Sequence, residues 1–504
     1  MKKILFSILL LLGFSFIFAQ ENISSDKILT DLLTGYLQND LELQKLTANA
    51  KSASLLLEQT NIENGISLNL STGSMILIPS SDGTSFTLSP ALSASVAKWN
   101  NTTLSLSTDL TVSNTEENQN GLENLSLSLS TQIIGTARKQ SQLENLKAKR
   151  QLILAKRNVE NRALSAEKEF YTDLKELLNE AANVLANEQD LYEEEVEFKK
   201  IQAQGYAKTS SSYRTQELKV RTANRTLEES KRNFVYLQNV LATKCGKELT
   251  RYTDKPKDAE EAKKRFETSL NEAWTFLPSS IPYVEAVELR DYKKENYTKI
   301  ESAAYDIELG KLTRDAQGDF SLDANAGYTF KNTQGLSSTS QGRDTIDAGA
   351  SLSWKGLSLN AGVSFPFSSE NNIPFYKMSL GFSPSQIRLS QIQSEQNALD
   401  EQIEQIALKD AEEDFRTQMV SQRTTLSNLN WAKMSDAEEL ELYTQLEKDN
   451  ENWFKQGIIN ESDYKASQVN KKKAEITCLV NAVEFIIYND TIKLLFVNEE
   501  VDKK

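Results

Sequence analysis

Two kinds of hydrophobic pattern alternate along this chain, and each occurs twice. Between about residues 65 and 134, and again between 319 and 382, apolar residues alternate with Ser, Thr, Asn or Asp, as in "TLSLSTDLTVS". Between about 136 and 204, and between 385 and 454, apolar residues recur at spacings of three and four. Strict alternation predicts strands with one apolar and one polar face, whereas the three-four spacing predicts long helices.

The predicted elements follow the same order in both halves of the chain. In the first half they are a helix at 24–62, strands at 65–134, a long helix at 136–204 and a helix at 212–245. In the second half they are a helix at 283–316, strands at 319–382, a long helix at 385–454 and a helix at 462–497. We therefore predict two structural repeats, 20–245 and 283–504, joined by a charged connector at 246–282 that packs on the outside of the helices.

The long helices need lateral support along their whole length. The segment 136–204 contains neither proline nor glycine and would reach roughly 100 Å at 1.5 Å per residue. Coiled-coil-like seams supply that support, and they comprise Phe170, Leu174 and Leu177 in the first half and Leu389, Ile392, Leu399, Ile403 and Ile406 in the second. The seams are dilute, so a plain antiparallel coiled coil and a wide ring of helices both remain open.

Each long helix ends at a break with the spacing G-x4-S-x5-Q. The first break has Gly205, Ser210 and Gln216. The second has the same residue types at 457, 462 and 468. Glycine commonly ends a helix and serine commonly caps the next one. The spacing therefore predicts two helical turns, one in each half.

The strand-like text divides into about four runs in each half. Most runs have 9–11 residues, the length that a tilted strand needs to cross a bilayer. The runs are Ile66–Ile78, Phe86–Val96, Thr102–Val112, Leu125–Ile134, Phe320–Phe330, Ile346–Trp354, Leu357–Phe367 and Phe375–Phe382. Aromatic residues gather near run ends, as they do at membrane interfaces; they are Trp99, Tyr328, Phe330, Trp354, Phe365, Phe367, Phe375 and Tyr376.

One run illustrates the two faces that a membrane strand would have. Its expected lipid-facing residues are Leu104, Leu106, Leu110 and Val112. Its expected lumen-facing residues are Ser105, Ser107 and Asp109. A carboxylate is tolerated in a water-filled lumen and is costly against lipid. The alternative is a soluble β-sandwich with one solvated face.

The first residues have the pattern of a secretory signal peptide. Lys2 and Lys3 precede an apolar stretch, and Ala19 stands at a plausible cleavage position. We expect residues 1–19 to be removed on export; an uncleaved membrane anchor is the alternative. No later stretch approaches 18 apolar residues, so we expect no membrane-spanning helix after export.

Composition excludes several classes of function. A net charge of −14 over 504 residues argues against nucleic acid as a partner. The chain has no histidine, which removes Ser-His-Asp catalysis and histidine-based zinc sites. It also has no G-x4-GK[ST] phosphate loop. We expect no catalysis, no cofactor and no metal; whether Cys245 and Cys478 pair stays open.

These features together resemble one family, the TolC-type outer-membrane efflux proteins. The residues that carry the resemblance are "LTGYLQNDLELQKLTANAKSA" at 33–53, "QGYAKTSSSYRTQ" at 204–216 and "QGIINESDYKASQ" at 456–468. The resemblance implies an α+β membrane protein in which long helical hairpins form a periplasmic α-barrel. The strands would contribute to a transmembrane β-barrel shared by three chains. The family usually has two strands per half, whereas up to four are counted here.

The resemblance also implies a function and partners. The homotrimer would be the outer-membrane channel of a tripartite efflux or type I secretion system in a diderm bacterium, in contact with outer-membrane lipid and extending into the periplasm. A periplasmic adaptor would dock at the turns, on Gly205, Ser210, Gly457 and Ser462, and couple the channel to an inner-membrane pump of RND, ABC or MFS type. Asp463 and Tyr464 would lie at the aperture gate. A stand-alone porin-like barrel and an exported coiled-coil interaction protein with a β-sandwich are the alternatives.

Overall fold

The computed structural model describes residues 27–80, 83–113, 121–247, 255–331, 344–367 and 373–498. The expected signal peptide, residues 1–19, lies outside the described residues. The chain divides into two units, and each is described by itself. Unit 1 comprises the described residues up to Gln44, together with Glu160–Tyr292 and Gln418–Phe496. Unit 2 comprises Lys45–Val159 and Lys293–Thr417, with the described residues after Phe496.

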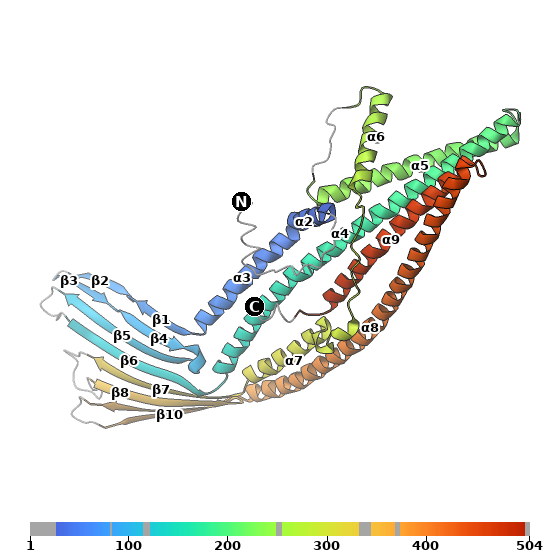
Figure 1. The fold of residues 1–504 in the computed structure, drawn as a ribbon. Coiled ribbons are helices and arrows are strands. Elements are labelled where there is room, and N and C mark those ends of the chain that lie inside the picture. Colours follow the sequence, from blue (N-terminus) through green and yellow to red (C-terminus); the bar gives the residue numbers. More distant parts are fainter. Residues whose placement is uncertain are drawn as a thin grey trace. The chain divides into compact units, whose positions relative to one another are not determined.

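The fold combines long helices with antiparallel strands, which confirms the predicted mixed class (Figure 1). The helices are α2 (Lys27–Asn39), α3 (Leu41–Glu63), α4 (Ala137–Ala203), α5 (Ser211–Lys244), α6 (Ala259–Phe276), α7 (Thr298–Ala316), α8 (Pro384–Lys455) and α9 (Glu461–Leu495). The strands are β1 (Ile66–Ser71), β2 (Met75–Ser80), β3 (Gly83–Leu88), β4 (Ala91–Val96), β5 (Thr102–Ser113), β6 (Gly121–Ile134), β7 (Phe320–Lys331), β8 (Asp344–Trp354), β9 (Leu357–Pro366) and β10 (Phe375–Phe382). None of the described helices carries an apolar stretch sufficient for a membrane crossing.

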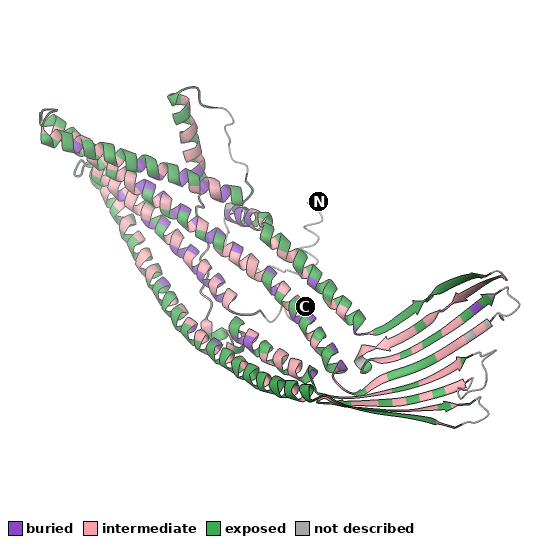
Figure 2. Ribbon diagram, turned by 180° about the vertical axis from the view of Figure 1, so that it is seen from behind, coloured by how far each residue is buried: buried purple, intermediate pink, exposed green. Residues whose placement is uncertain are grey.

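Unit 1 contains a hydrophobic core built on the predicted seam of α4. Phe170, Leu174 and Leu177 are fully buried there. They pack with residues of α2, α5 and α9, such as Leu32, Phe234 and Val483; the buried positions are purple in Figure 2. Fully burying an apolar side chain of this size contributes about 1.5–3 kcal/mol. The three-four spacing of α4 therefore marks a face that is covered within the chain.

The first predicted helix, 24–62, is two helices, α2 and α3, that meet at Asp40. The Asp40 carboxylate accepts a hydrogen bond from the backbone N–H of Leu43 at 2.8 Å. It also pairs with Arg162 of α4 at 2.6 Å. An aspartate that accepts from the third residue after it is a helix cap. A capping residue inside an apolar helical pattern thus ends one helix and begins the next.

The predicted helix at 283–316 begins late, because α7 starts only at Thr298. The residues before it are non-helical apart from two short 3-10 turns, Leu289–Asp291 and Lys294–Asn296. Asn489 of α9 holds this segment: its side chain accepts from the N–H of Val287 at 2.9 Å and donates to the carbonyl of Glu285 at 2.8 Å. These bonds satisfy backbone groups that a helix would otherwise pair, so the helical expectation was wrong here.

The predicted connector, 246–282, contains the helix α6. Trp274 of α6 packs on Phe234 of α5, with ring centroids 4.9 Å apart. The Arg232 guanidinium of α5 lies over the ring of Phe266 at 5.6 Å. The connector is therefore held to α5 by aromatic contacts.

The described strands of unit 2 form one ten-stranded sheet with antiparallel pairing throughout. The main path runs β1-β4-β5-β6-β7-β8-β9-β10, while β3 pairs with both β2 and β5. Two predicted runs, Ile66–Ile78 and Phe86–Val96, are therefore each broken into two strands. Gly73 lies at the first break with a φ of +64°, and a Cβ there would be 1.7 Å from the carbonyl oxygen of Ser89. The break at Gly73 lies so close to the backbone of Ser89, in the second break, that only glycine fits there.

The helices of unit 2 are joined by ion pairs. Glu301 of α7 accepts hydrogen bonds from Arg150 and Arg157 of α4. Arg314 of α7 pairs with Glu404 of α8 at 2.8 Å. The predicted apolar seam of α8 is not covered within the chain: Leu399 is 58% exposed and Ile406 is 65% exposed, so this part of α8 is mostly green in Figure 2.

Candidate functional site: two helical turns and a two-faced sheet

The first predicted turn joins α4 to α5 in unit 1. Gly205 has a φ of +76°, and a Cβ built on it meets no atom within 4 Å. Its backbone N–H donates to the carbonyl of Gln202 at 3.1 Å. Ser210 is the N-cap of α5 and accepts from the N–H of Tyr213 at 3.3 Å. Gly205 thus supplies the left-handed residue that closes α4, and it faces open space.

The second turn, between α8 and α9, has the same glycine but a different cap. Gly457 has a φ of +70° and also faces open space. Asn460, rather than the predicted Ser462, caps α9 by accepting from the N–H of Asp463 at 2.8 Å. Ser462 lies inside the first turn of the helix. Asparagine is as good a cap as serine, so the matching serine spacing did not locate the helix start.

An aromatic pair links the two arms of each turn. Phe198 of α4 meets Tyr213 of α5 edge-on, with centroids 5.0 Å apart. Phe454 of α8 stacks on Tyr464 of α9 at 5.4 Å. The two hairpins also touch, because the Lys465 ammonium lies over the ring of Tyr192 at 4.1 Å. These contacts fix both turns within one helical end of unit 1.

The two residues predicted for a gate lie together in the first turn of α9. Asp463 is exposed and close to the helix N-terminus, where a negative charge is favoured by the helix dipole. Tyr464 is half-buried against Phe454. Asp463 is therefore free to meet solvent or ions, while Tyr464 has a packing role inside the hairpin.

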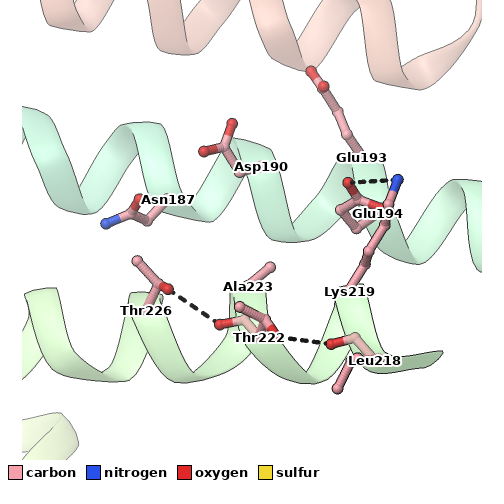
Figure 3. A pocket seen from close by; sticks show the side chains of 9 residues that line it. All are labelled: Asn187, Asp190, Glu193, Glu194, Leu218, Lys219, Thr222, Ala223 and Thr226. Atoms are coloured by element: carbon pink, nitrogen blue, oxygen red, sulfur yellow. Dashed lines mark hydrogen bonds and ion pairs between the residues drawn. The ribbon is translucent and has the colours of Figure 1, made fainter. Parts of the chain in front are cut away.

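A pocket of about 450 Å³ lies between α4 and α5 below the first turn (Figure 3). Its α5 side is lined by the small residues Thr222, Ala223 and Thr226, and its α4 side carries carboxylates. In Figure 3 the Glu194 carboxylate lies against Lys219, 3.8 Å away, whereas Asp190 and Glu193 point away from α5. The pocket therefore offers a floor of small residues beside the paired charges of Glu194 and Lys219.

This pocket was not predicted from the sequence, although a signal was present. Gln216, the last residue of the repeated spacing, is buried and donates to the carbonyl of Glu194 at 3.1 Å. Small residues then recur on α5 at 222, 223 and 226. A buried glutamine followed by small residues at helical spacing indicates where α5 approaches α4 closely.

Strand β5 has the two faces expected of it. Its polar face is joined to its neighbours by side chains: Asn124 donates to Asp109 at 3.1 Å, Ser105 bonds Ser128, and Thr111 bonds Thr87. Its apolar face is open in the single chain, with Leu104 at 47%, Leu106 at 39%, Leu110 at 38% and Val112 at 60% exposure.

Strand register extends the apolar face of β5 across the sheet. Leu106 pairs with Leu127, Leu127 with Tyr328, and Tyr328 with Ile346. At one end of this face the register aligns Phe320 with Trp354, and at the other it aligns Ile346 with Phe365. On β7 the two rows, at 320 and 328, lie about 26 Å apart, given ~3.3 Å per residue. Leucine, alanine and valine occupy most of the positions between them.

The described residues carry carboxylates and cysteine thiols, the groups that could form a metal site or a reactive thiol centre. They contain no group of three or more Cys, Asp or Glu side chains placed to hold a metal ion. Cys245 and Cys478 are both free thiols. Burial raises the pKa of the Cys245 thiol to about 12, so this cysteine is inert packing in the core.

Two family comparisons match the two halves of the chain. Residues 32–274 match the TP096X N-terminal domain, and residues 282–499 match the TP096X C-terminal domain. The matches follow the domain order and together span well over half of the chain. The chain belongs to the TP096X family.

The chain is also similar to solved structures of low sequence identity. The outer membrane protein VceC from Vibrio cholerae is 14% identical over 93% of this chain and 95% of that chain, with a TM-score of 0.46. The MtrE outer membrane channel of Neisseria gonorrhoeae, in its open state, is 12% identical over 94% and 93%, with a TM-score of 0.48. No curated protein matches this chain.

Proposed function

We propose that this protein is a homotrimeric channel of the outer membrane of a diderm bacterium, the passive exit duct of a tripartite efflux or type I secretion system. The observation that carries the proposal is the two-faced sheet. Register gathers apolar side chains on one face and Ser, Asn, Asp and Gly on the other.

The apolar face suits lipid in both extent and composition. The hydrocarbon-facing band of outer-membrane strands is about 25 Å tall and is flanked by aromatic girdles. The aromatic rows at Phe320 and Tyr328 are about 26 Å apart along the strand at ~3.3 Å per residue, which a tilt of about 40° reduces to roughly 20 Å of height. The opposite face carries Ser107 and Asp109, which suit a water-filled lumen. We therefore assign Leu104, Leu106, Leu110 and Val112 to lipid.

The sheet's unpaired edges support assembly with further copies of the chain. Among the described strands, β1 pairs only with β4, β2 only with β3, and β10 only with β9. The edge strands β1 and β10 expose large apolar residues, such as Leu68 at 72% and Met378 at 78%. Open apolar edges promote association, and pairing β10 of one copy with β1 of the next would close a barrel. The resemblance of the sequence to TolC-type proteins favours three copies.

The helical turns are the proposed docking site for a periplasmic adaptor. Gly205 and Gly457 leave open space at the surface, so a partner helix can approach closely. The pocket between α4 and α5 adds a floor of small residues, Thr222, Ala223 and Thr226, on which a partner side chain can pack. The adaptor would connect the channel to an RND, ABC or MFS pump, which supplies the energy and selects drugs, metabolites or proteins.

Asp463 is the proposed gate residue, with Tyr464 holding its helix against α8. Three copies around an axis would bring three exposed carboxylates together and bind cations. We expect Asp463→Ala to weaken the block of single-channel conductance by divalent cations in planar bilayers. Glu461→Ala is the matched control, because Glu461 lies in the same turn and pairs with Lys465 at 2.7 Å. Unchanged block in Asp463→Ala would remove this residue from the gate.

Mass in detergent together with conductance tests the whole proposal. A species three times the chain mass that needs detergent and conducts in planar bilayers is the expected result. A conducting or poorly conducting monomer that needs detergent would favour a stand-alone porin-like barrel. A species that stays soluble without detergent would favour an exported coiled-coil protein with a β-sandwich.

A further inference from the structure

Helices α4 and α9 pack against one another in unit 1 with a register set by ion contacts. Lys175 of α4 pairs with Glu484 of α9 at 2.6 Å. Nearer the turns, Tyr192 of α4 meets Lys465 of α9, so the helices run antiparallel. On α4, Glu167 lies about two turns before Lys175. On α9, Asp490 lies nearly two turns after Glu484. Because the helices are antiparallel, the register that pairs Lys175 with Glu484 also brings the carboxyl groups of Glu167 and Asp490 to a common level.

Asp490 is a buried carboxylate, and one of its two oxygens has no hydrogen-bond partner. Its exposed fraction is 1%. Oδ1 pairs with Lys493 of the same helix at 3.2 Å, whereas Oδ2 is buried without a hydrogen-bond partner. A buried carboxylate oxygen without a donor is costly. A hydrogen-bond donor beside this oxygen would therefore stabilise the site.

On α4, Glu167 lies close enough to Asp490 for the charge of Asp490 to act on it. Burial raises the pKa of Glu167 to about 7, with repulsion from Asp490 adding to the shift and Lys493 opposing it. Burial also raises the pKa of Asp490, against the opposing charges of Lys493 and Lys168. When Glu167 carries a proton, it is a donor at the level where Oδ2 lacks one.

Two phenols at this contact each have a pKa above its ordinary value. Burial raises the pKa of the Tyr171 phenol of α4 above its ordinary value, and the negative charges of both carboxylates add to this effect. Tyr292, in the segment before α7, feels the charge of Lys493, and burial raises the pKa of this phenol too. The charge state of the contact near pH 7 is therefore set by the carboxyl pair.

We propose that Glu167 and Asp490 hold one proton between them and form a proton-operated clamp of α4 to α9. Two carboxyl groups that meet out of water cannot both ionise without cost. With the proton in place, the pair joins the helices; once it is lost, two negative charges repel across the contact and loosen it. The clamp does not depend on the proposed channel function.

The pH window follows from the raised pKa of Glu167. When α9 opens away, Glu167 returns to its ordinary pKa of 4.5, whereas in the closed contact the pKa is about 7. The clamp therefore acts fully below about pH 4.5 and is lost as pH rises through about 7. Linkage makes the opening constant rise roughly tenfold per pH unit between these values and flatten above them.

Hydrogen exchange of the full chain in detergent measures this opening. Exchange of amides in 483–495 of α9 is followed from pH 5 to 8.5 and corrected for the intrinsic pH dependence of exchange. The wild type should show the tenfold rise per unit and the plateau, and Glu167→Gln should remove the rise. Glu176→Gln, an exposed glutamate on the same helix, should keep it.

Two results would overturn the clamp. One is a wild-type opening constant that stays flat between pH 5 and 7, which needs no variant. The other is a rise that persists in Glu167→Gln. If that variant does not fold, Asp490→Asn tests the pair in another way. It removes the charge that adds to the effect of burial on the Glu167 pKa, so it should shorten the pH range of the rise without abolishing it, and an unchanged rise would overturn the pairing.

Discussion

The core of unit 1 and the sheet of unit 2 both have an apolar face that the sequence pattern predicts. The face in unit 1 is buried, whereas the face of the sheet is exposed. On α4, Phe170 and Leu174 have no exposed surface, because helices of the same chain cover them. On the sheet, Leu68 and Met378 expose more than two thirds of their surface. The difference teaches that periodicity marks an apolar face without saying what covers it. In unit 1 the cover is the chain itself, and for the sheet we propose lipid and further copies.

The largest effect is expected from opening a cavity in the core of unit 1. Phe170→Ala should lower the free energy of unfolding by about 3–5 kcal/mol, as is typical for truncating a buried aromatic residue. Ile403→Ala, on the exposed seam of α8 (63% exposed), should cost less than about 1 kcal/mol within the chain, since little buried contact is lost. Urea unfolding monitored by tryptophan fluorescence measures both. Equal losses would mean that the α8 seam is covered as fully as the core.

A second pair of variants tests the two faces of β5. Leu106→Arg should cost about 1–2 kcal/mol if that face meets lipid, less than at the centre of a bilayer, because register aligns Leu106 with the aromatic row at Tyr328. Ser107→Arg, one residue along and on the opposite face, should fold normally and shift the ion selectivity of the channel. Folding into lipid vesicles followed by gel mobility compares the two. If both variants insert equally well, the assignment of Leu106 to lipid is wrong.

The third prediction concerns the ion pairs that join the helices of unit 2. Burial alone would raise the pKa of Glu301, but hydrogen bonds from Arg150 and Arg157 outweigh it and lower the pKa to about 2. The stability that this carboxylate contributes is therefore present above its ordinary pKa of 4.5 and is lost as pH falls towards 2.

Glu301→Gln should accordingly melt below the wild type at pH 6, and the gap should close on acidification from 4.5 to 2. Scanning calorimetry across that range measures the gap. The control is Glu308→Gln, at an exposed position of the same helix. A gap that stays constant with pH would show that the two arginines do not depend on the Glu301 charge.

The smallest effects on stability are expected at the turns, where nothing packs on the glycines. Gly457→Val should cost about 1–2 kcal/mol, because a side chain is strained at a φ of +70°. Gly457→Asn should cost less, since asparagine visits this conformation. If the glycine serves docking, both variants should form trimers yet lower efflux in cells. Normal efflux with Gly457→Asn would show that the role is only structural, and Gly205 allows the same comparison.

Particular residues show how far sequence reasoning reached. Alternation along β5 assigned its two faces, because side-chain direction in a strand follows from position alone. The helix predicted at 283–316 was wrong in its first part, because Asn489 lies about two hundred residues away and no local pattern reveals that its side chain binds this segment. Ser462 was placed as a cap by analogy with Ser210, yet Asn460 stood two residues earlier with equal capping strength.

Local patterns were enough to give most helices and strands, the duplicated plan and the positions of the two turns, because helix and strand periods and glycine conformations are local properties. Which faces meet depends on the tertiary fold. Strand register aligned the aromatic rows at Phe320 and Tyr328 with their neighbours, and helix packing brought Glu167 to Asp490. Such contacts join residues far apart in the chain, and their energies arise from desolvation and close packing, which exist only once the chain has folded.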